Sequence, residues 1–207
     1  EVITFPVPFL LIEIKENIIL NTNISDETSK EKIINQAFKF HSEGEIAKAT
    51  KYYQQFLNQG FTDHRVFSNY GIILRNNCNL KEAELLQRKA IALNPDYAEA
   101  HSSLGNILRD LGNLKEAKLS VLKAIELNPD YAEAHSNLGN ILRDLGNFKE
   151  AELSVLKAIE LNPDYAEAHS NLGNISRDLG KLKEAELSQR KAIELNPNYA
   201  EAHSNLG

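Results

Sequence analysis

Two consecutive blocks of 34 residues read AEAHSSLGNILRDLGNLKEAKLSVLKAIELNPDY (residues 98–131) and AEAHSNLGNILRDLGNFKEAELSVLKAIELNPDY (residues 132–165). The two blocks differ at only three places: Ser103 against Asn137, Leu114 against Phe148, and Lys118 against Glu152. Followed outward, the same period divides the chain into blocks 30–63, 64–97, 98–131, 132–165 and 166–199, with a truncated block 200–207. Self-similarity at a fixed period of this length is the signature of a repeat protein.

Each block carries two runs of apolar residues at three- and four-residue intervals. In the block 132–165 the first run is Ala134, Leu138, Ile141 and Leu145, and the second is Phe148, Ala151, Val155, Ala158 and Ile159. This spacing predicts two amphipathic helices per block. One such helix pair is too small to bury its apolar face alone, so neighbouring pairs must stack. The predicted fold is therefore all-α, a superhelical solenoid of antiparallel helix pairs.

Turn and cap residues lie where this arrangement needs them. Gly146 is expected to end the first helix in the left-handed conformation. Asp130 and Asn147 are expected to cap the two helices of the block, each with a Glu three residues on in a capping box. Proline follows the second helix in several blocks, for example at Pro129, Pro163 and Pro197. Cys78 stands where other blocks have Gly112, Gly146 and Gly180, so its backbone is expected to be strained.

The pattern resembles the tetratricopeptide repeat. The features that carry the resemblance are Leu-Gly at the seventh and eighth places, Ala at the twentieth and twenty-seventh, and Pro at the thirty-second, as in Leu138-Gly139, Ala151, Ala158 and Pro163. In amino-acid sequence the blocks most resemble cyanobacterial tetratricopeptide arrays, and they are more distantly similar to the array of O-linked N-acetylglucosamine transferase. The resemblance covers residues 30–207 and implies a surface that binds another polypeptide.

The two ends of the chain depart from the pattern. Block 30–63 has Phe56 where Ala is usual and Gly60-Phe61 where Asn-Pro is usual, so it is predicted to be a divergent first repeat. Residues 1–29 lie outside the repeat and are expected to be extended or disordered. The chain starts at Glu1 and stops at Gly207 within the pattern, so we expect it to be part of a longer protein.

Composition narrows the class of protein. The net charge of −6 argues against nucleic acid as a partner, because binding to phosphates needs Lys and Arg. The longest apolar stretch, residues 7–14, is too short to span a membrane, and no secretory signal is evident. The single cysteine, Cys78, cannot form an internal disulfide, which favours a cytoplasmic location.

The sequence predicts no catalytic site, no metal site and no cofactor. Four histidines, His101, His135, His169 and His203, recur at the fourth place of their blocks. Helices that stack about 8 to 10 Å apart cannot bring them to one metal ion, since such ligands lie about 2 Å from the metal. We interpret them as packing residues at a place where the family usually has an aromatic residue. Phosphate-binding loops and protease motifs are missing as well.

The resemblance implies that the first helix of each repeat lines a concave face that binds the ligand. The sixth place carries Asn35, Asn69, Ser103, Asn137, Asn171 and Asn205, and the ninth carries Asn106, Asn140 and Asn174. An amide side chain both donates and accepts, so a ladder of asparagines suits the main chain of an extended peptide. The alternative is that duplication has copied a solvated face without any role in binding.

Arginines recur at the twelfth place, as Arg75, Arg109, Arg143 and Arg177. They are candidates for a clamp on acidic groups of a ligand. The equal alternative is that they complement the end of the helix dipole or pair with Asp110, Asp144 and Asp178. The second and fifth places hold Glu and Ser, which disfavours the carboxylate clamp of chaperone-binding arrays.

The leading functional hypothesis is a scaffold that binds a protein or peptide partner in the concave groove. A second hypothesis makes the array the substrate-recruiting arm of a transferase whose catalytic domain lies outside these residues. A third makes it a structural spacer that associates end to end through an uncapped C-terminal face.

Overall fold

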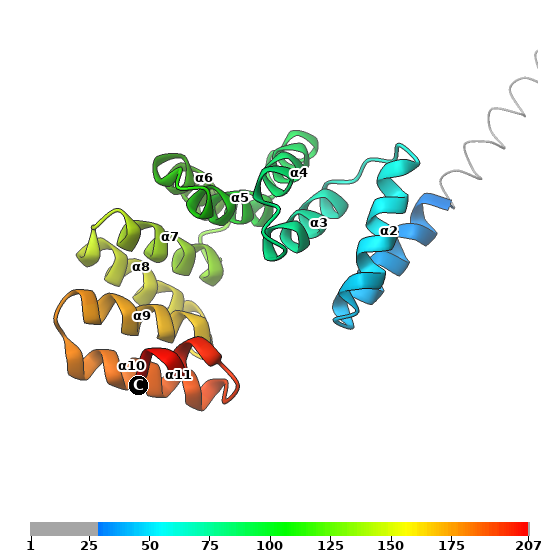
Figure 1. Ribbon diagram of the computed structural model, residues 1–207. Coiled ribbons are helices and arrows are strands. Elements are labelled where there is room, and N and C mark those ends of the chain that lie inside the picture. The colour runs from blue at the N-terminus through cyan, green and yellow to red at the C-terminus, as the bar shows by residue number, and fades with distance from the viewer. Residues whose placement is uncertain (1–28, 207) are drawn as a thin grey trace, which may run out of the picture. The chain divides into compact units, whose positions relative to one another are not determined.

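The computed structural model describes residues 29–206, so the expectation for residues 1–28 lies outside the described part of the chain. Two compact units share these residues, one ending at Thr62 and the other beginning at Asp63 (Figure 1). Every regular element among the described residues is an α-helix, and none of these helices is long and apolar enough to cross a membrane.

The first unit is a helix pair. Residues 29–42 form its first helix and α2 (Ile46–Asn58) its second, with a turn at Gly44. The rings of Phe40 and Tyr52 stack with centroids 5.5 Å apart, and His41 Nδ1 lies 3.0 Å from the Tyr53 hydroxyl. Aromatic contacts thus hold together the block that departs most from the repeat pattern.

The described residues of the second unit form nine helices in chain order. They are α3 (His64–Asn76), α4 (Leu80–Leu93), α5 (Ala98–Asp110), α6 (Leu114–Leu127), α7 (Ala132–Asp144), α8 (Phe148–Leu161), α9 (Ala166–Asp178), α10 (Leu182–Leu195) and α11 (Ala200–Leu206). The prediction of two helices in each complete block is confirmed, and so is the all-helical solenoid fold.

Stacking within the second unit follows one rule along its length. Each first helix packs against the second helix of its own repeat, and that second helix packs against the first helix of the next repeat. Successive first helices, α3, α5, α7, α9 and α11, also contact one another. In the described part of the chain, successive second helices do not pack on each other in this way. The first helices therefore form an inner layer and the second helices an outer layer.

Small residues allow the two helices of a repeat to approach closely. A Cβ atom added to Gly139 would lie 2.3 Å from Cγ2 of Val155, which leaves no room for any larger residue on α7. Leu138, Ile141 and Ala158 complete the buried contact between α7 and α8 and belong to a core that runs through several repeats. This packing explains why Leu-Gly recurs at the seventh and eighth places.

The turn between the two helices is built as the sequence predicts. Gly146 has a φ of 78°, its N–H donates to the carbonyl of Arg143 at 2.9 Å, and the N–H of Asn147 donates to Leu142 at 2.8 Å. These two bonds form a Schellman motif. Cys78 takes the same conformation with a φ of 60°, which confirms the expected left-handed backbone.

The predicted side-chain caps are wrong. The residue that precedes α7 is Tyr131 rather than Asp130, and neither it nor Asn147 before α8 caps its helix through a side chain. Asn128 organises the turn instead, since its Oδ1 accepts the N–H of Asp130 at 3.3 Å. The Asn-Pro-Asp segment is therefore a turn that moves the helix start one residue further along the chain.

Candidate functional site

The inner face of the second unit is formed by the first helices α3, α5, α7, α9 and α11. Glu133, Asn137, Asn140 and Asp144 on α7 follow each other at intervals of four, three and four residues, so they lie along one stripe of the helix. The same places recur in the neighbouring repeats, and the twelfth-place arginines lie beside the last residue of each stripe. We use the term inner face for these stripes and arginines.

Two asparagines of the predicted ladder are buried between repeats. Asn137 and Asn171 are only 3% and 5% exposed, and their Nδ2 atoms donate to Oγ of Ser102 and Ser136, each at 2.9 Å. These two side chains are therefore not exposed on a ligand-binding face, as the asparagine ladder would require. Each one joins its repeat to the preceding repeat, because an amide at the sixth place reaches the hydroxyl at the fifth place of the neighbour.

The other asparagines divide between exposed and buried positions. Asn69, Asn140 and Asn205 are partly exposed, although the Nδ2 atom of Asn205 is itself buried without a partner among the described residues. Asn106 and Asn174 are buried. Asn35 is exposed but belongs to the first unit.

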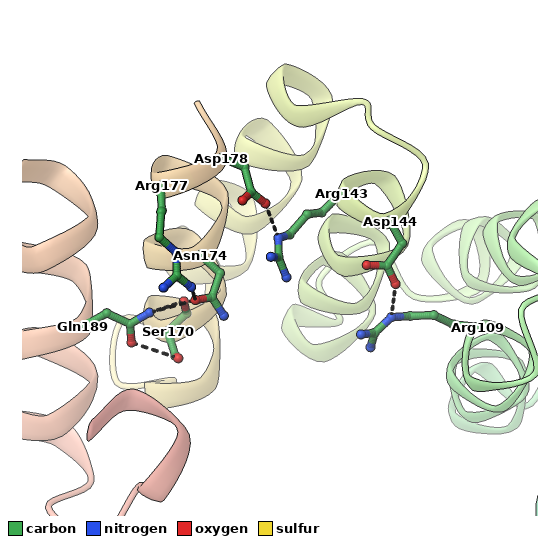
Figure 2. A network of polar contacts seen from close by, with 8 residues as sticks. All are labelled: Arg109, Arg143, Asp144, Ser170, Asn174, Arg177, Asp178 and Gln189. Carbon is green, nitrogen blue, oxygen red and sulfur yellow. Dashed lines mark hydrogen bonds and ion pairs between the residues drawn. The ribbon is translucent and has the colours of Figure 1, made fainter. Parts of the chain in front are cut away.

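A polar network surrounds Asn174 (Figure 2). Its Oδ1 accepts from Nη2 of Arg177 at 2.7 Å and from Nε2 of Gln189 at 3.2 Å. Gln189 is buried, and its Oε1 accepts the hydroxyl hydrogen of Ser170 at 3.0 Å. Asn174 therefore links α9 to α10, and its side chain is already engaged within the repeat.

The arginines form a ladder between repeats. Nε of Arg75 donates to Oδ2 of Asp110 at 2.6 Å, Nε of Arg109 donates likewise to Asp144, and Arg143 donates to Asp178. The alternative of pairing with these aspartates is thus confirmed for three of the four arginines, and each pair joins one repeat to the next. Arg177 bonds Asn174 instead.

The arginine side chains engage the aspartates through one edge only. In Figure 2, Nε of Arg109 and Arg143 faces the carboxylate, and the two terminal nitrogens point away from it. The side chains of Arg109 and Arg143 are 28% and 31% exposed. A guanidinium carries five N–H donors in a fixed fork, so the terminal nitrogens still have donors to offer.

An acidic row that the sequence reasoning missed lies at the opposite end of the first helices. The hydroxyl groups of Tyr131, Tyr165 and Tyr199 donate to Glu133, Glu167 and Glu201 at 3.2 to 3.3 Å. Burial raises the pKa of these three phenols. The recurrence of Tyr at the last place and Glu at the second place of the blocks was the signal in the sequence that could have revealed the row.

The pKa of Glu167 responds to charged groups of several repeats. The side chain of Glu167 is exposed, but the protein atoms around it reduce its solvation and so raise its pKa, and the hydrogen bond from Tyr165 opposes the shift. The like charges of Glu133 and Glu201 also raise this pKa, whereas the charge of Arg75 lowers it. Arg75 lies on α3 and Glu167 on α9, so charges from distant repeats act across the same inner face.

The four histidines support the turns. Nε2 of His101, His135, His169 and His203 lies 2.9 Å from the carbonyl oxygen of Pro95, Pro129, Pro163 and Pro197, respectively. A carbonyl only accepts, so Nε2 carries the hydrogen in each of these contacts. Each histidine thus ties its first helix to the turn before it.

Comparisons with known protein families identify the repeat. Residues 105–146, 139–176 and 173–207 match a family described as TPR repeat, and residues 86–118 match one described as Tetratricopeptide repeat. These matches together cover residues 86–207, which is more than half of the chain. No curated protein sequence matches this chain.

Solved structures share the fold at low sequence identity. A thermophilic TPR protein of Thermus thermophilus, TTC0263, is 21% identical, with a TM-score of 0.74 over 86% of this chain and 96% of that one. MamA of Desulfovibrio magneticus is 20% identical, with a TM-score of 0.64 over 83% and 97%. YrrB, described as a TPR protein with an unusual peptide-binding site, is 24% identical, with a TM-score of 0.60 over 88% and 95%.

Proposed function

This chain belongs to the tetratricopeptide repeat family, and from that premise we propose that its inner face binds an extended polypeptide without chemistry of its own. Solenoids of this kind generally serve protein–protein interaction through long curved surfaces. The structural neighbour YrrB is described as having a peptide-binding site, which supports a binding role for the shared fold.

One observation carries the proposal: the same polar stripe recurs on first helices that pack side by side. Packed helices lie about 8 to 10 Å apart, and an extended chain advances about 3.3 to 3.6 Å per residue. Each repeat therefore meets roughly three residues of an extended ligand. A ligand of about ten residues would contact the stripes of α5, α7 and α9 in turn.

The proposed contacts are the inner-face groups that still have hydrogen-bonding capacity at the surface. Asn69 and Asn140 are partly exposed and offer their amides to the main chain of the ligand. Asn205 is also partly exposed, but it offers only its amide oxygen because its Nδ2 atom is buried. The terminal nitrogens of Arg75, Arg109, Arg143 and Arg177 offer donors to carbonyl or carboxylate oxygens. In this proposal the buried Asn106, Asn137, Asn171 and Asn174 set the spacing of the exposed groups.

Charge suggests how the ligand lies across the stripes. The glutamates at the second place form an acidic edge, and the arginines lie at the other end of the same helices. A ligand with basic side chains toward the tyrosine and glutamate row, and with oxygen acceptors toward the arginines, complements both edges. Such complementarity contributes more to orientation and association rate than to affinity.

A peptide selection tests the proposal. A display library of random 12-residue peptides is panned against the full chain, and the affinity of the selected peptides is measured by calorimetry. We expect the substitutions Asn69→Ala, Asn140→Ala and Arg143→Ala together to weaken binding by about 10- to 150-fold, as expected for losing one to a few net hydrogen bonds.

The matched control replaces three exposed lysines of the outer layer, Lys115, Lys149 and Lys183, by Ala. This control should keep the wild-type affinity. A similar loss in both variants, or peptides that bind the inner-face variant as well as wild type, would remove the inner face as the binding surface.

A further inference from the structure

The outer layer exposes leucines that the fold does not need. Leu119 and Leu122 on α6 are 67% and 40% exposed, and Leu153 and Leu156 on α8 are 68% and 44% exposed. Single exposed apolar residues are ordinary, but here two exposed leucines recur at the same places of two successive second helices, and exposed apolar surface of this kind marks a candidate interaction site. α6 packs on the rest of its repeat through Ala117, Val121 and Ala124, so the leucines are not part of that contact.

The leucines lie in a seam with charged ends. On α6 the seam is Lys115, Leu119, Leu122 and Glu126, at intervals of four, three and four residues, and on α8 it is Lys149, Leu153, Leu156 and Glu160. This is the spacing of the contact positions in a coiled coil. Each seam therefore runs from a positive end through two leucines to a negative end, and we refer to these eight residues as the outer seam.

The neighbouring helices limit the outer seam to two repeats. α4 and α10 keep an exposed leucine, Leu85 and Leu187, but carry Arg88 and Arg190 at the second leucine position. Arg88 pairs with Glu84 and Glu116, and Arg190 pairs with Glu186, so both arginines have acidic partners within the chain. The apolar patch thus ends on both sides in charged residues.

We propose that the outer seam is a docking surface for a second copy of this chain, with α6 and α8 each packed antiparallel against the same helix of the partner copy. Reversing the order Lys-Leu-Leu-Glu places Lys opposite Glu at both ends and Leu119 opposite Leu122 at the centre. A twofold interface requires such self-complementarity, since each contact occurs twice. An antiparallel coiled-coil contact also places opposite seam positions against each other.

The acidic ends remain available for this contact. Glu126 and Glu160 each lie 2.8 Å from a lysine on the same helix, Lys123 and Lys157, but the two glutamate side chains are 70% and 69% exposed. Exposed pairs at this spacing hold the carboxylate only weakly. Because the outer seam offers only four leucines, we expect a weak dimer with a dissociation constant of roughly 10 to 500 µM.

Sedimentation velocity of the full chain between about 5 and 500 µM measures this association. The wild-type chain should pass from monomer to dimer over this range, and Leu119→Glu with Leu153→Glu should weaken the dimer by at least about tenfold. The matched control, Leu85→Glu with Leu187→Glu, changes two similarly exposed leucines outside the outer seam and should dimerise like wild type. Circular dichroism melts verify that all variants fold.

Charge-reversal variants test whether the partner on the outer seam is a second copy of this chain. Glu126→Lys with Glu160→Lys gives all-positive ends, and Lys115→Glu with Lys149→Glu gives all-negative ends. Each variant alone should dimerise at least about tenfold more weakly than wild type, and an equimolar mixture should recover an affinity within about threefold of it.

Three results would overturn the proposal. A wild-type chain that stays monomeric at about 500 µM leaves no dimer to explain. A dimer that survives Leu119→Glu with Leu153→Glu uses another surface, such as the C-terminal end of the array. A mixture of the charge variants that does not recover association excludes the antiparallel arrangement. None of these results bears on peptide binding at the inner face.

Discussion

Cys78 holds a backbone conformation that favours glycine. It is the one residue other than glycine with a positive φ in the described part of the chain, and the equivalent Gly112, Gly146 and Gly180 have open space where a Cβ would lie. A left-handed backbone costs a residue with a Cβ about 1 to 2 kcal/mol. Replacing that residue by glycine recovers only part of this energy, because glycine also raises the conformational entropy of the unfolded chain.

We therefore expect Cys78→Gly to raise the free energy of unfolding by about 1 kcal/mol, measured by urea titration. Cys78→Ala is the matched control, since it removes the thiol but keeps the Cβ in the same conformation. An equal gain for the alanine variant would show that the thiol, rather than the backbone, causes the strain.

Asn137 and Asn140 are two asparagines on the same helix, but their surroundings differ. Asn137 is buried and bonds Ser102 of the preceding repeat, whereas Asn140 is partly exposed. Asn137→Ala should lower the free energy of unfolding by about 1 to 3 kcal/mol, because it leaves a buried hydroxyl without its donor. Asn140→Ala should change it by less than about 0.5 kcal/mol. Equal losses on urea titration would contradict the inter-repeat role of Asn137.

At the level of the helices, the inner layer holds carboxylates of like charge close together. The pKa of Glu167 is raised above its ordinary value, first by reduced solvation and then by Glu133 and Glu201, against the effects of Tyr165 and Arg75. A folded-state pKa above the unfolded value means that the folded chain binds this proton more tightly. The contribution of Glu167 to stability is therefore fully present below its unfolded pKa and is lost as the pH rises through the folded pKa.

Glu167→Gln should accordingly raise the melting temperature at about pH 7 and leave it nearly unchanged near pH 3, where the glutamate is protonated in both states. Glu184→Gln is the matched control, since Glu184 also lies in the first turn of its helix, where a carboxylate interacts favourably with the helix dipole. A lower melting temperature for Glu167→Gln than for Glu184→Gln at neutral pH would show that the acidic row does not disfavour the charged form.

At the scale of the whole molecule, the period of 34 residues predicted the fold because each block has apolar residues at the same places and buries them with the same pair of helices. Leu138, Gly139 and Ala158 are expected at the contact between the two helices of their repeat, and the structure confirms this packing. The cap at Asp130 was mispredicted because Asn128 and Asp130 lie in the same turn and both can accept a backbone N–H. Only the structure shows that Asn128 accepts the N–H of Asp130.

The candidate site was harder to predict because periodicity within one helix does not show what the next repeat covers. Asn137 and Asn140 lie on one stripe, and only the packing of α5 against α7 buries the first of them. The arginine ladder has the same origin, since Arg109 reaches an aspartate 35 residues away along the chain. The tyrosine and glutamate row was visible as a pattern, but its shared electrostatic environment arises from the curvature of the stack.

Photocrosslinking tests the central claim, that the inner face binds an extended polypeptide, most directly. A photoreactive amino acid is placed at Asn140 on the inner face in one variant and at Lys149 on the outer layer in another, and each is irradiated with a peptide selected on the wild-type chain. Our account predicts a crosslink from position 140 and none from position 149. A crosslink from position 149 alone would contradict it and place the ligand on the outer layer.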